Sequence, residues 1–304
     1  MYITTTNETF IQPQCIAGCP CPTWNNQPNQ HCCRTCYNGR KCIHSTITRQ
    51  TEIERSRLFD FERLSRGYEI KKSSKGFTRS SEIMKSQEIH IIPFNNLISK
   101  KLVGLVGFYY PSYQTPADAI CNCGFLGNFY ETVINFASPT DPKKEYVFKN
   151  AEALFQALKF WNYAEKFTNM TGSQAFQEKM KWKGYEDWTY AGFGNNWLAM
   201  FAVLRAKFRQ NENLMTKLIS TDNAFLIEHN VKPGRDKIWS DNSDGEGFNW
   251  LGLQLMIIRD ELRGTSEWTE ILYNCVDMSN GNIKPESEWQ NTVRLASRTL
   301  AKYQ

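Results

Sequence analysis

The stretch from residue 150 to 162 carries apolar residues on almost every side when it is read as a helix at about 100° per residue. Only one narrow strip is polar, formed by Glu152, Gln156 and Lys159 at positions i, i+4 and i+7. A helix that is apolar on most sides is expected to be buried. A buried acid, amide and amine must then bond one another or face a polar pocket or a ligand. The pattern predicts a polar wall inside an apolar domain.

The remaining hydrophobic periodicity predicts a mainly α domain with a few short strands. Apolar residues recur at helical spacing over residues 195–210, 214–218, 249–262 and 286–302. The sequence predicts strands over residues 102–110, 125–131 and 146–148. We therefore expect one compact helical domain over residues 102–304, preceded by a smaller module.

The N-terminal segment, residues 1–46, has little apolar material and holds most of the ten Cys residues of the chain. Short Cys and His spacings of this kind are typical of tetrahedral zinc sites. The alternative is a disulfide knot, which requires an oxidising compartment. The candidate ligands outnumber those of one zinc, so one zinc with spare thiols and two zincs both remain open. They are Cys15, Cys19, Cys21, His31, Cys32, Cys33, Cys36, Cys42 and His44.

Residues 47–101 mix charged and scattered apolar residues, with basic residues in excess, and read as a basic linker or arm. The formal net charge of the chain, +5, is too small to indicate nucleic-acid binding by itself. A solvated linker is therefore the favoured interpretation, and contact between residues 1–101 and nucleic acid or protein is the alternative. The N-terminus lacks a charged start followed by an apolar run, and the apolar stretch 102–110 is too short to span a bilayer. We expect an intracellular protein, cytoplasmic or nuclear, that is not secreted and contacts no membrane.

The segment from Glu228 to Gly252 gathers carboxylates and an aromatic residue before a predicted helix. A phosphate-binding site at the start of this helix is one interpretation, but the acidic residues of the segment would repel phosphate. A calcium-binding loop is another, but counting from Asp241 puts Glu246 at the position that requires the turn glycine. Cleavage of a ribosyl C–N bond instead needs a carboxylate near the anomeric carbon, an acid for the leaving base and a positioned water. A turn whose Asp residues only cap helices remains the other interpretation.

Several short motifs in a fixed order carry a family resemblance. They are Gly127-Asn128-Phe129-Tyr130, Glu152-x3-Gln156-x2-Lys159-Phe160, Leu204-Arg-Ala-Lys207-Phe208, Leu226-x-Glu228-His229, Asp236-x2-Trp239 and Gly247-x-Asn249-x-Leu251-Gly252-x2-Leu255-Met256-x2-Arg259. Together they resemble the YbiA-like family, also called NADAR, over about residues 107–263. The resemblance implies a mainly α domain that hydrolyses N-glycosidic bonds to a phosphorylated ribose. Family members cleave early riboflavin-pathway intermediates to release ribose 5-phosphate, or remove ADP-ribose from modified guanine in DNA.

The resemblance and the residue types together suggest site residues. The predicted catalytic residues are Glu152, as an acid/base or a ribose-hydroxyl ligand, and Asp241 with Asp236, for stabilising a ribosyl cation or orienting water. Lys159 and Lys207 are candidates for phosphate contact. The predicted substrate-binding residues are Asn128, Phe129, Gln156, Lys159, Lys207, Glu228, Trp239, Gly247 and Asn249. His229 is expected to be structural, and Gly127 stands where many family members have Ser.

The leading hypothesis is therefore an N-glycosidase that acts on a small phosphorylated ribosyl substrate, such as a ribosylamino-pyrimidine phosphate, without a catalytic cofactor. One alternative is a hydrolase that removes ADP-ribose from guanine in nucleic acid, with the basic linker binding the phosphates of that nucleic acid. Another is a non-catalytic module that binds NAD or ADP-ribose. Zinc is expected only as a structural metal of the N-terminal module.

Overall fold

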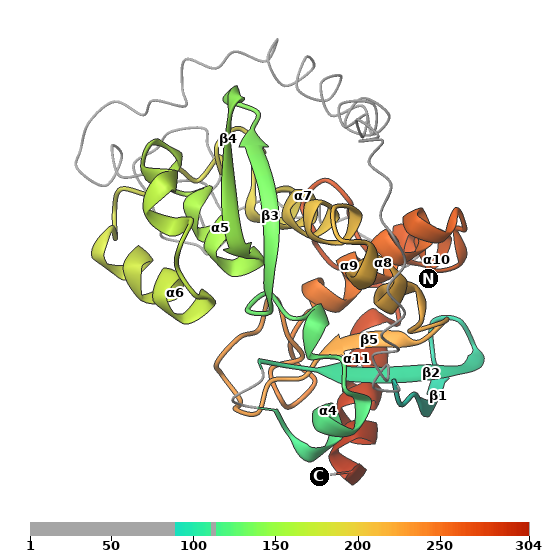
Figure 1. The fold of residues 1–304 in the computed structure, drawn as a ribbon. Helices are drawn as coiled ribbons and strands as arrows, with labels where there is room; N and C mark the ends of the chain where they lie inside the picture. Colours follow the sequence, from blue (N-terminus) through green and yellow to red (C-terminus); the bar gives the residue numbers. More distant parts are fainter. Residues whose placement is uncertain (1–88, 111–113, 304) are drawn as a thin grey trace, which may run out of the picture. The chain divides into compact units, whose positions relative to one another are not determined.

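The computed structural model describes residues 89–110 and 114–303 (Figure 1). The predicted zinc module, with all of its candidate ligands, lies outside the described residues, as does most of the predicted linker. Both therefore stay predictions. Within the described part, no helix is long and apolar enough to cross a membrane.

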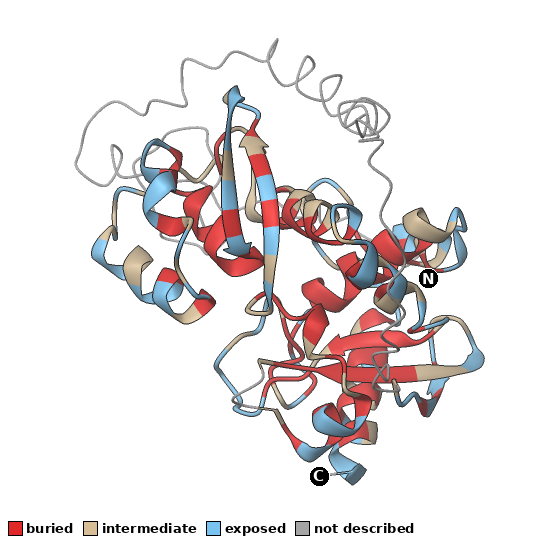
Figure 2. Ribbon diagram, in the orientation of Figure 1, coloured by how far each residue is buried: buried red, intermediate tan, exposed pale blue. Residues whose placement is uncertain are grey.

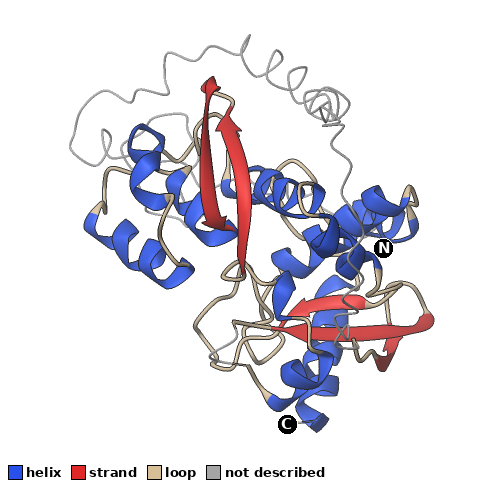
Figure 3. Ribbon diagram, in the orientation of Figure 1, coloured by secondary structure: helices blue, strands red, loops and turns tan. Residues whose placement is uncertain are grey.

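The described residues form a mostly helical fold with short strands, as expected (Figure 3). The α-helices are α4 (Pro116–Cys121), α5 (Ala151–Ala157), α6 (Gly172–Lys181), α7 (Asn196–Arg209), α8 (Glu212–Ile219), α9 (Trp250–Arg263), α10 (Glu267–Cys275) and α11 (Trp289–Leu300). The 3-10 helices are η3 (Gly124–Leu126), η4 (Trp161–Phe167) and η5 (Ala301–Tyr303). The strands are β1 (Ile92–Asn96), β2 (Lys101–Phe108), β3 (Glu131–Ser138), β4 (Asp141–Asn150) and β5 (Phe225–Glu228).

A small mixed sheet has the strand order β1-β2-β5. Strands β1 and β2 are antiparallel, with Ile92 opposite Leu105, while β2 and β5 are parallel, with Phe108 opposite Glu228. The parallel pair ends at one edge, so the residues that follow β2 and those that end β5 meet there. Strand β1 lies inside the segment predicted as a linker, and the sheet therefore begins earlier in the chain than residue 102.

The core lies where helices cover this sheet, and Figure 2 shows the continuous buried faces. The ring of Phe225 on β5 contacts the fully packed rings of Trp268 and Trp289, at centroid distances of 5.8 and 5.5 Å. Helices α7 and α9 also pack against each other. The hairpin β3–β4 projects from this body and leads directly into α5 (Figure 1).

Two predicted elements are wrong in extent or type. Residues 125–131 do not form a strand but contain η3 and a turn, and β3 begins only at Glu131. The helix predicted over 150–162 ends at Ala157 as α5, because Phe160 adopts φ −140° and the chain continues as η4. Asn150 caps α5 as its side chain accepts a hydrogen bond from the amide of Ala153.

Candidate active site

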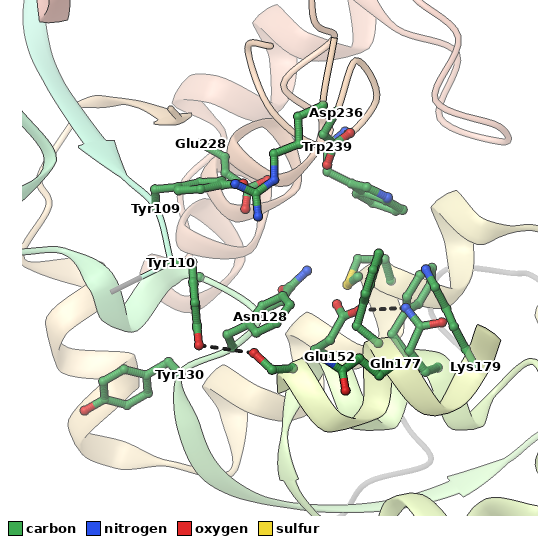
Figure 4. A pocket seen from close by; sticks show the side chains of 18 of the residues that line it. Tyr109, Tyr110, Asn128, Tyr130, Glu152, Gln177, Lys179, Glu228, Asp236 and Trp239 are labelled. Atoms are coloured by element: carbon green, nitrogen blue, oxygen red, sulfur yellow. Dashed lines mark hydrogen bonds between the residues drawn. The ribbon is translucent and has the colours of Figure 1, made fainter. Parts of the chain in front are cut away.

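A cavity of about 350 Å³ lies where the end of the β2–β5 pair meets α5, α6 and the loop after β5 (Figure 4). Its lining includes eight of the predicted site residues: Asn128, Phe129, Glu152, Gln156, Lys159, Glu228, Asp236 and Trp239. The remaining lining residues are Tyr109, Tyr110, Gly127, Tyr130, Phe155, Ser173, Phe176, Gln177, Lys179, Met200 and Arg235. Four predicted residues, Lys207, Asp241, Gly247 and Asn249, are not part of this lining.

One wall of the cavity is the polar strip formed by α5 and the turn that follows it. Gln156 Nε2 donates to Glu152 Oε1 over 2.6 Å, and Lys159 Nζ donates to Gln156 Oε1 over 2.9 Å. The side chains are almost completely buried, with 7%, 2% and 8% of Glu152, Gln156 and Lys159 exposed. The strip is therefore a hydrogen-bonded chain that faces the cavity, as the helical spacing predicted.

Lysines gather at one end of the cavity. Burial, followed by the charge of the nearby Lys179, lowers the pKa of Lys159 to about 8. Burial also lowers the pKa of Lys179, which lies at the end of the cavity opposite Tyr110 and Tyr130 (Figure 4). Two partly desolvated ammonium groups close to each other favour an anionic ligand beside them.

The opposite wall carries two carboxyl groups, Glu228 and Asp236, which face Glu152 across the cavity (Figure 4). Burial, together with the charges of Asp236 and Glu152, raises the pKa of Glu228 well above its usual range. Among the described residues, no hydrogen bond holds the Glu228 carboxyl group. Asp236 is fixed more firmly, because its Oδ1 accepts hydrogen bonds from the amides of Ile238 and Trp239 at 2.9 Å.

The other end of the cavity is aromatic. The rings of Tyr110 and Phe129 lie 4.8 Å apart, and Tyr110 Oη lies 3.2 Å from Ser173 Oγ. The guanidinium of Arg235 lies 5.7 Å from the ring centre of Tyr109. A Cβ atom added at Gly172 would come within 2.4 Å of the Phe129 ring, so the first residue of α6 sets the position of this wall.

Asp241 is not at the cavity, contrary to the catalytic role predicted for it. The side chain is fully buried and accepts hydrogen bonds from the amides of Asn230 and Ser243, both at 2.9 Å. Its other oxygen lies 2.7 Å from His229 Nδ1. Burial alone would lower the pKa of His229, but the hydrogen bond and charge of Asp241 raise it. Asp241 and His229 therefore hold the loop together.

Lys207, which was predicted to contact phosphate, does not line the cavity either. Its side chain is 0% exposed, and Nζ donates to the carbonyls of Phe125, Leu126 and Gly127 over 2.7, 3.3 and 2.8 Å. Burial lowers the pKa of Lys207 to about 7. All three donors of the ammonium are thus engaged with the turn that precedes Asn128, and none is left for a phosphate.

Asn249 and Gly247 shape the loop rather than contact a ligand. Asn249 Oδ1 accepts from the amide of Glu228 over 3.0 Å, and its Nδ2 donates to the carbonyl of Leu226 over 2.9 Å. Asn249 directly precedes α9 with φ 51°, and its side chain makes no capping hydrogen bond to that helix. A Cβ at Gly247 would lie 2.1 Å from the Ser240 carbonyl oxygen, which explains the glycine.

The cavity is also lined by Lys179, Arg235 and Tyr109, which were not predicted as site residues. Tyr109 follows β2 directly, and the parallel pairing of β2 with β5 brings it to Glu228. Recognition of Phe225–Glu228 as a strand, which the sequence analysis did not predict, would have indicated that Tyr109 and Glu228 meet. Lys179 lies on α6, which the periodicity did not indicate.

Comparison with known proteins places the cavity within a known domain family. Residues 115–263 match the NADAR domain. The riboflavin biosynthesis protein VVA0006 of Vibrio vulnificus is 31% identical over 147 residues, which are 47% of this chain and 36% of that protein. The N-glycosidase YbiA of Escherichia coli is 28% identical over 156 residues, covering 43% of this chain and 89% of YbiA. The chain thus spans little more than a third of the Vibrio relative.

A solved relative is the NMR structure of Escherichia coli YbiA. It is 25% identical in sequence, with a TM-score of 0.40, and covers 52% of this chain and 85% of its own.

Proposed function

Because residues 115–263 form a NADAR domain, we propose that this chain is an N-glycosidase that hydrolyses the bond between ribose 5-phosphate and an amine nitrogen of a heterocycle. The substrates we propose are ribosylamino-pyrimidine phosphates, the early intermediates of riboflavin biosynthesis. The names of the relatives support this choice, since one is an N-glycosidase and another a riboflavin biosynthesis protein.

The observation that carries the proposal is the order of chemical groups along one cavity. Lys179 lies at one end with Lys159 near it, the carboxyl groups lie between, and Tyr110 and Tyr130 lie at the other end. The lysine end also has aromatic rings, since Phe155 lies beneath Lys159 Nζ and packs against Trp239. This order matches a substrate made of phosphate, ribose and a flat base. The volume, about 350 Å³, falls near the lower limit of small-molecule sites, roughly 300–1,000 Å³. It suits one ribosyl phosphate with one heterocycle better than a dinucleotide.

In the reaction we propose, Glu228 is the general acid. Its raised pKa keeps the carboxyl group protonated at higher pH than usual, and no hydrogen bond within the described residues commits its proton. As the C1′–N bond breaks, the bonding electrons go to the nitrogen, which takes the Glu228 proton. The ribosyl group becomes oxocarbenium-like at that moment and needs negative charge beside it.

Asp236 takes the role that the sequence analysis divided between Asp236 and Asp241. The backbone amides of Ile238 and Trp239 hold one of its oxygens, so the carboxylate is oriented before substrate binds. We assign it to stabilise the ribosyl cation and to accept a proton from the water whose oxygen bonds C1′. Glu152, tied to Gln156, is then placed to accept hydrogen bonds from ribose hydroxyls.

The test is release of ribose 5-phosphate from a ribosylamino-pyrimidine phosphate by the full chain. We expect Glu228→Gln to lower kcat by roughly 100-fold or more, the usual contribution of a general acid. The matched control is Glu246→Gln in the loop that follows β5, since Glu246 pairs with Arg294 and does not line the cavity. Equal rates for wild type and Glu228→Gln would refute the mechanism.

The same assay separates the competing functions. NAD, ADP-ribose and ADP-ribosylated DNA are supplied in parallel with the ribosyl phosphates. Thermal stabilisation by one of these ligands without any product would favour a binding module instead. Release of ADP-ribose from DNA alone would favour the nucleic-acid hydrolase.

A further inference from the structure

Asn128 presents an amide to the cavity whose bonding capacity is not used. The residue is 8% exposed and lines the cavity beside Phe129. Its Oδ1 atom is buried and has no hydrogen-bond partner among the residues that the structure describes. An unpaired buried amide oxygen costs about 1–3 kcal/mol. A ligand donor would remove that cost once the amide turns to bring its oxygen, which is closed to solvent, to the cavity.

The backbone on both sides of Asn128 is fixed, so the amide is held at one place. The carbonyl of Asn128 accepts from the amide of Glu152 over 3.0 Å, which ties it to the start of α5. The preceding carbonyl, that of Gly127, accepts from Lys207 Nζ and from the amide of Tyr130. The side chain is therefore presented by a rigid turn, as an element of recognition requires.

The position of Asn128 along the cavity indicates which part of a substrate it meets. Its neighbour Phe129 forms a ring pair with Tyr110, and Figure 4 shows Asn128 beside Tyr110 and away from Lys179. A phosphate at the lysine end and a ribose among the carboxyl groups leave the leaving base at this aromatic end. Flat rings favour stacking on such side chains.

We infer that Asn128 reads the edge of the leaving base. Its Oδ1 accepts a hydrogen bond from a ring N–H, while its Nδ2 donates to the carbonyl oxygen next to that N–H. The chemical class selected is a heterocycle with a lactam edge, such as an aminopyrimidinone. The orientation of the substrate in this inference rests on the function proposed above, but the complementarity of amide and lactam does not.

The experiment measures binding of the free base and needs no turnover. The probes are 5,6-diaminouracil and its 1,3-dimethyl analogue, in which methyl groups replace the ring N–H hydrogens. Each is titrated by calorimetry into wild type, Asn128→Ala and Asn128→Asp. Good paired contacts of an amide with a base edge discriminate by about 1–3 kcal/mol, or roughly 5- to 150-fold. We expect wild type to prefer the unmethylated base by a factor in this range.

Asn128→Ala should bind both bases equally, at the affinity that wild type shows for the methylated one. Asn128→Asp keeps an acceptor but loses the Nδ2 donor, and should show an intermediate preference. It also serves if the Ala variant does not fold. The matched control is Asn274→Ala, since Asn274 is an exposed amide on α10, and its preference should equal that of wild type.

Each outcome decides the inference. Equal affinity of wild type for the two bases, or an unchanged preference in Asn128→Ala, overturns it and leaves Asn128 as a buried amide with no role in recognition of the base. A preference that is lost in Asn128→Ala supports it, even if no ribosyl phosphate is hydrolysed. In that last case the proposed function fails while the reading of the base stands.

Discussion

The strip on α5 and the loop from His229 to Asn249 both bring polar residues to this part of the molecule, but by different means. On α5 the helical repeat aligns Glu152 and Gln156, the turn after the helix adds Lys159, and all three residues line the cavity. In the loop, Asp236 lines the cavity while Asp241 is buried behind it in backbone hydrogen bonds. Spacing therefore identifies function on a regular helix, whereas in a loop the surrounding amides decide it.

The sharpest test of this comparison exchanges the two aspartates for asparagine. Asp236→Asn should lower kcat by roughly 100-fold or more, because it removes the charge that we assign to the ribosyl cation. Its thermal unfolding should change little. Asp241→Asn should instead lower the free energy of unfolding by about 1–3 kcal/mol, because an amide cannot replace a carboxylate that accepts from Asn230, Ser243 and His229.

Calorimetric unfolding and ribose 5-phosphate release, measured on both variants, check this pair of expectations. If Asp241→Asn keeps its stability and loses only turnover, the division of the loop into a catalytic and a structural aspartate is wrong.

The two buried lysines offer the next comparison. Lys207→Met leaves the carbonyls of Phe125, Leu126 and Gly127 without their donor, and should destabilise the chain by about 1–3 kcal/mol. Lys159→Met should change stability less and raise KM for a phosphorylated ribosyl substrate relative to its unphosphorylated form. Denaturant midpoints and KM values for both substrates provide the measurement. An equal KM effect from the two variants would contradict the assignment of the anion site to Lys159.

The pH dependence of stability tests the environment of Glu228. The folded chain holds the Glu228 proton more tightly than the unfolded chain, since burial raises the pKa. Its contribution to stability is therefore fully present below the unfolded pKa and is lost as pH rises through the folded pKa. Glu228→Gln has no proton to lose, so its stability should fall less than that of wild type above pH 5.

Unfolding midpoints of wild type and Glu228→Gln across pH 4–9 measure this difference. Turnover should show the same trend, with kcat declining at alkaline pH once the general acid ionises. Parallel stability curves for the two proteins would mean that Glu228 is not held in the protonated form.

The smallest expected effect comes from Gly172→Ala at the start of α6. The added methyl group would meet the Phe129 ring at 2.4 Å, so the ring must shift at the base-binding end. We expect a cost of about 1 kcal/mol, seen as roughly a fivefold rise in KM. Gly264→Ala, where nothing lies within 4 Å of the added Cβ, is a control in which only the backbone is strained, since Gly264 has φ 68°, and it should leave KM unchanged. A larger KM effect from Gly264→Ala would exclude the Phe129 contact as the cause.

The helices with a clear apolar repeat, α7, α9 and α11, follow the sequence prediction because a repeat over three turns specifies both helix and face. The short elements do not. Strand β5 is only four residues long and buried at its first three, so its pattern cannot be told from a helix turn, and it was not among the predicted strands. The prediction of Lys207 as a phosphate ligand failed for a related reason, because its carbonyl partners lie some eighty residues away in sequence. Such long-range partners leave no trace in local spacing.

The ammonium of Lys207 does for the turn at residues 125–127 what a bound metal ion often does for a loop of converging carbonyl oxygens. Here the charge is covalently part of α7 and is delivered when that helix packs. Assembly of the aromatic end of the cavity is therefore tied to folding of the core itself. A chelator should leave the geometry at Asn128 untouched, whatever it does to metals bound elsewhere in the chain.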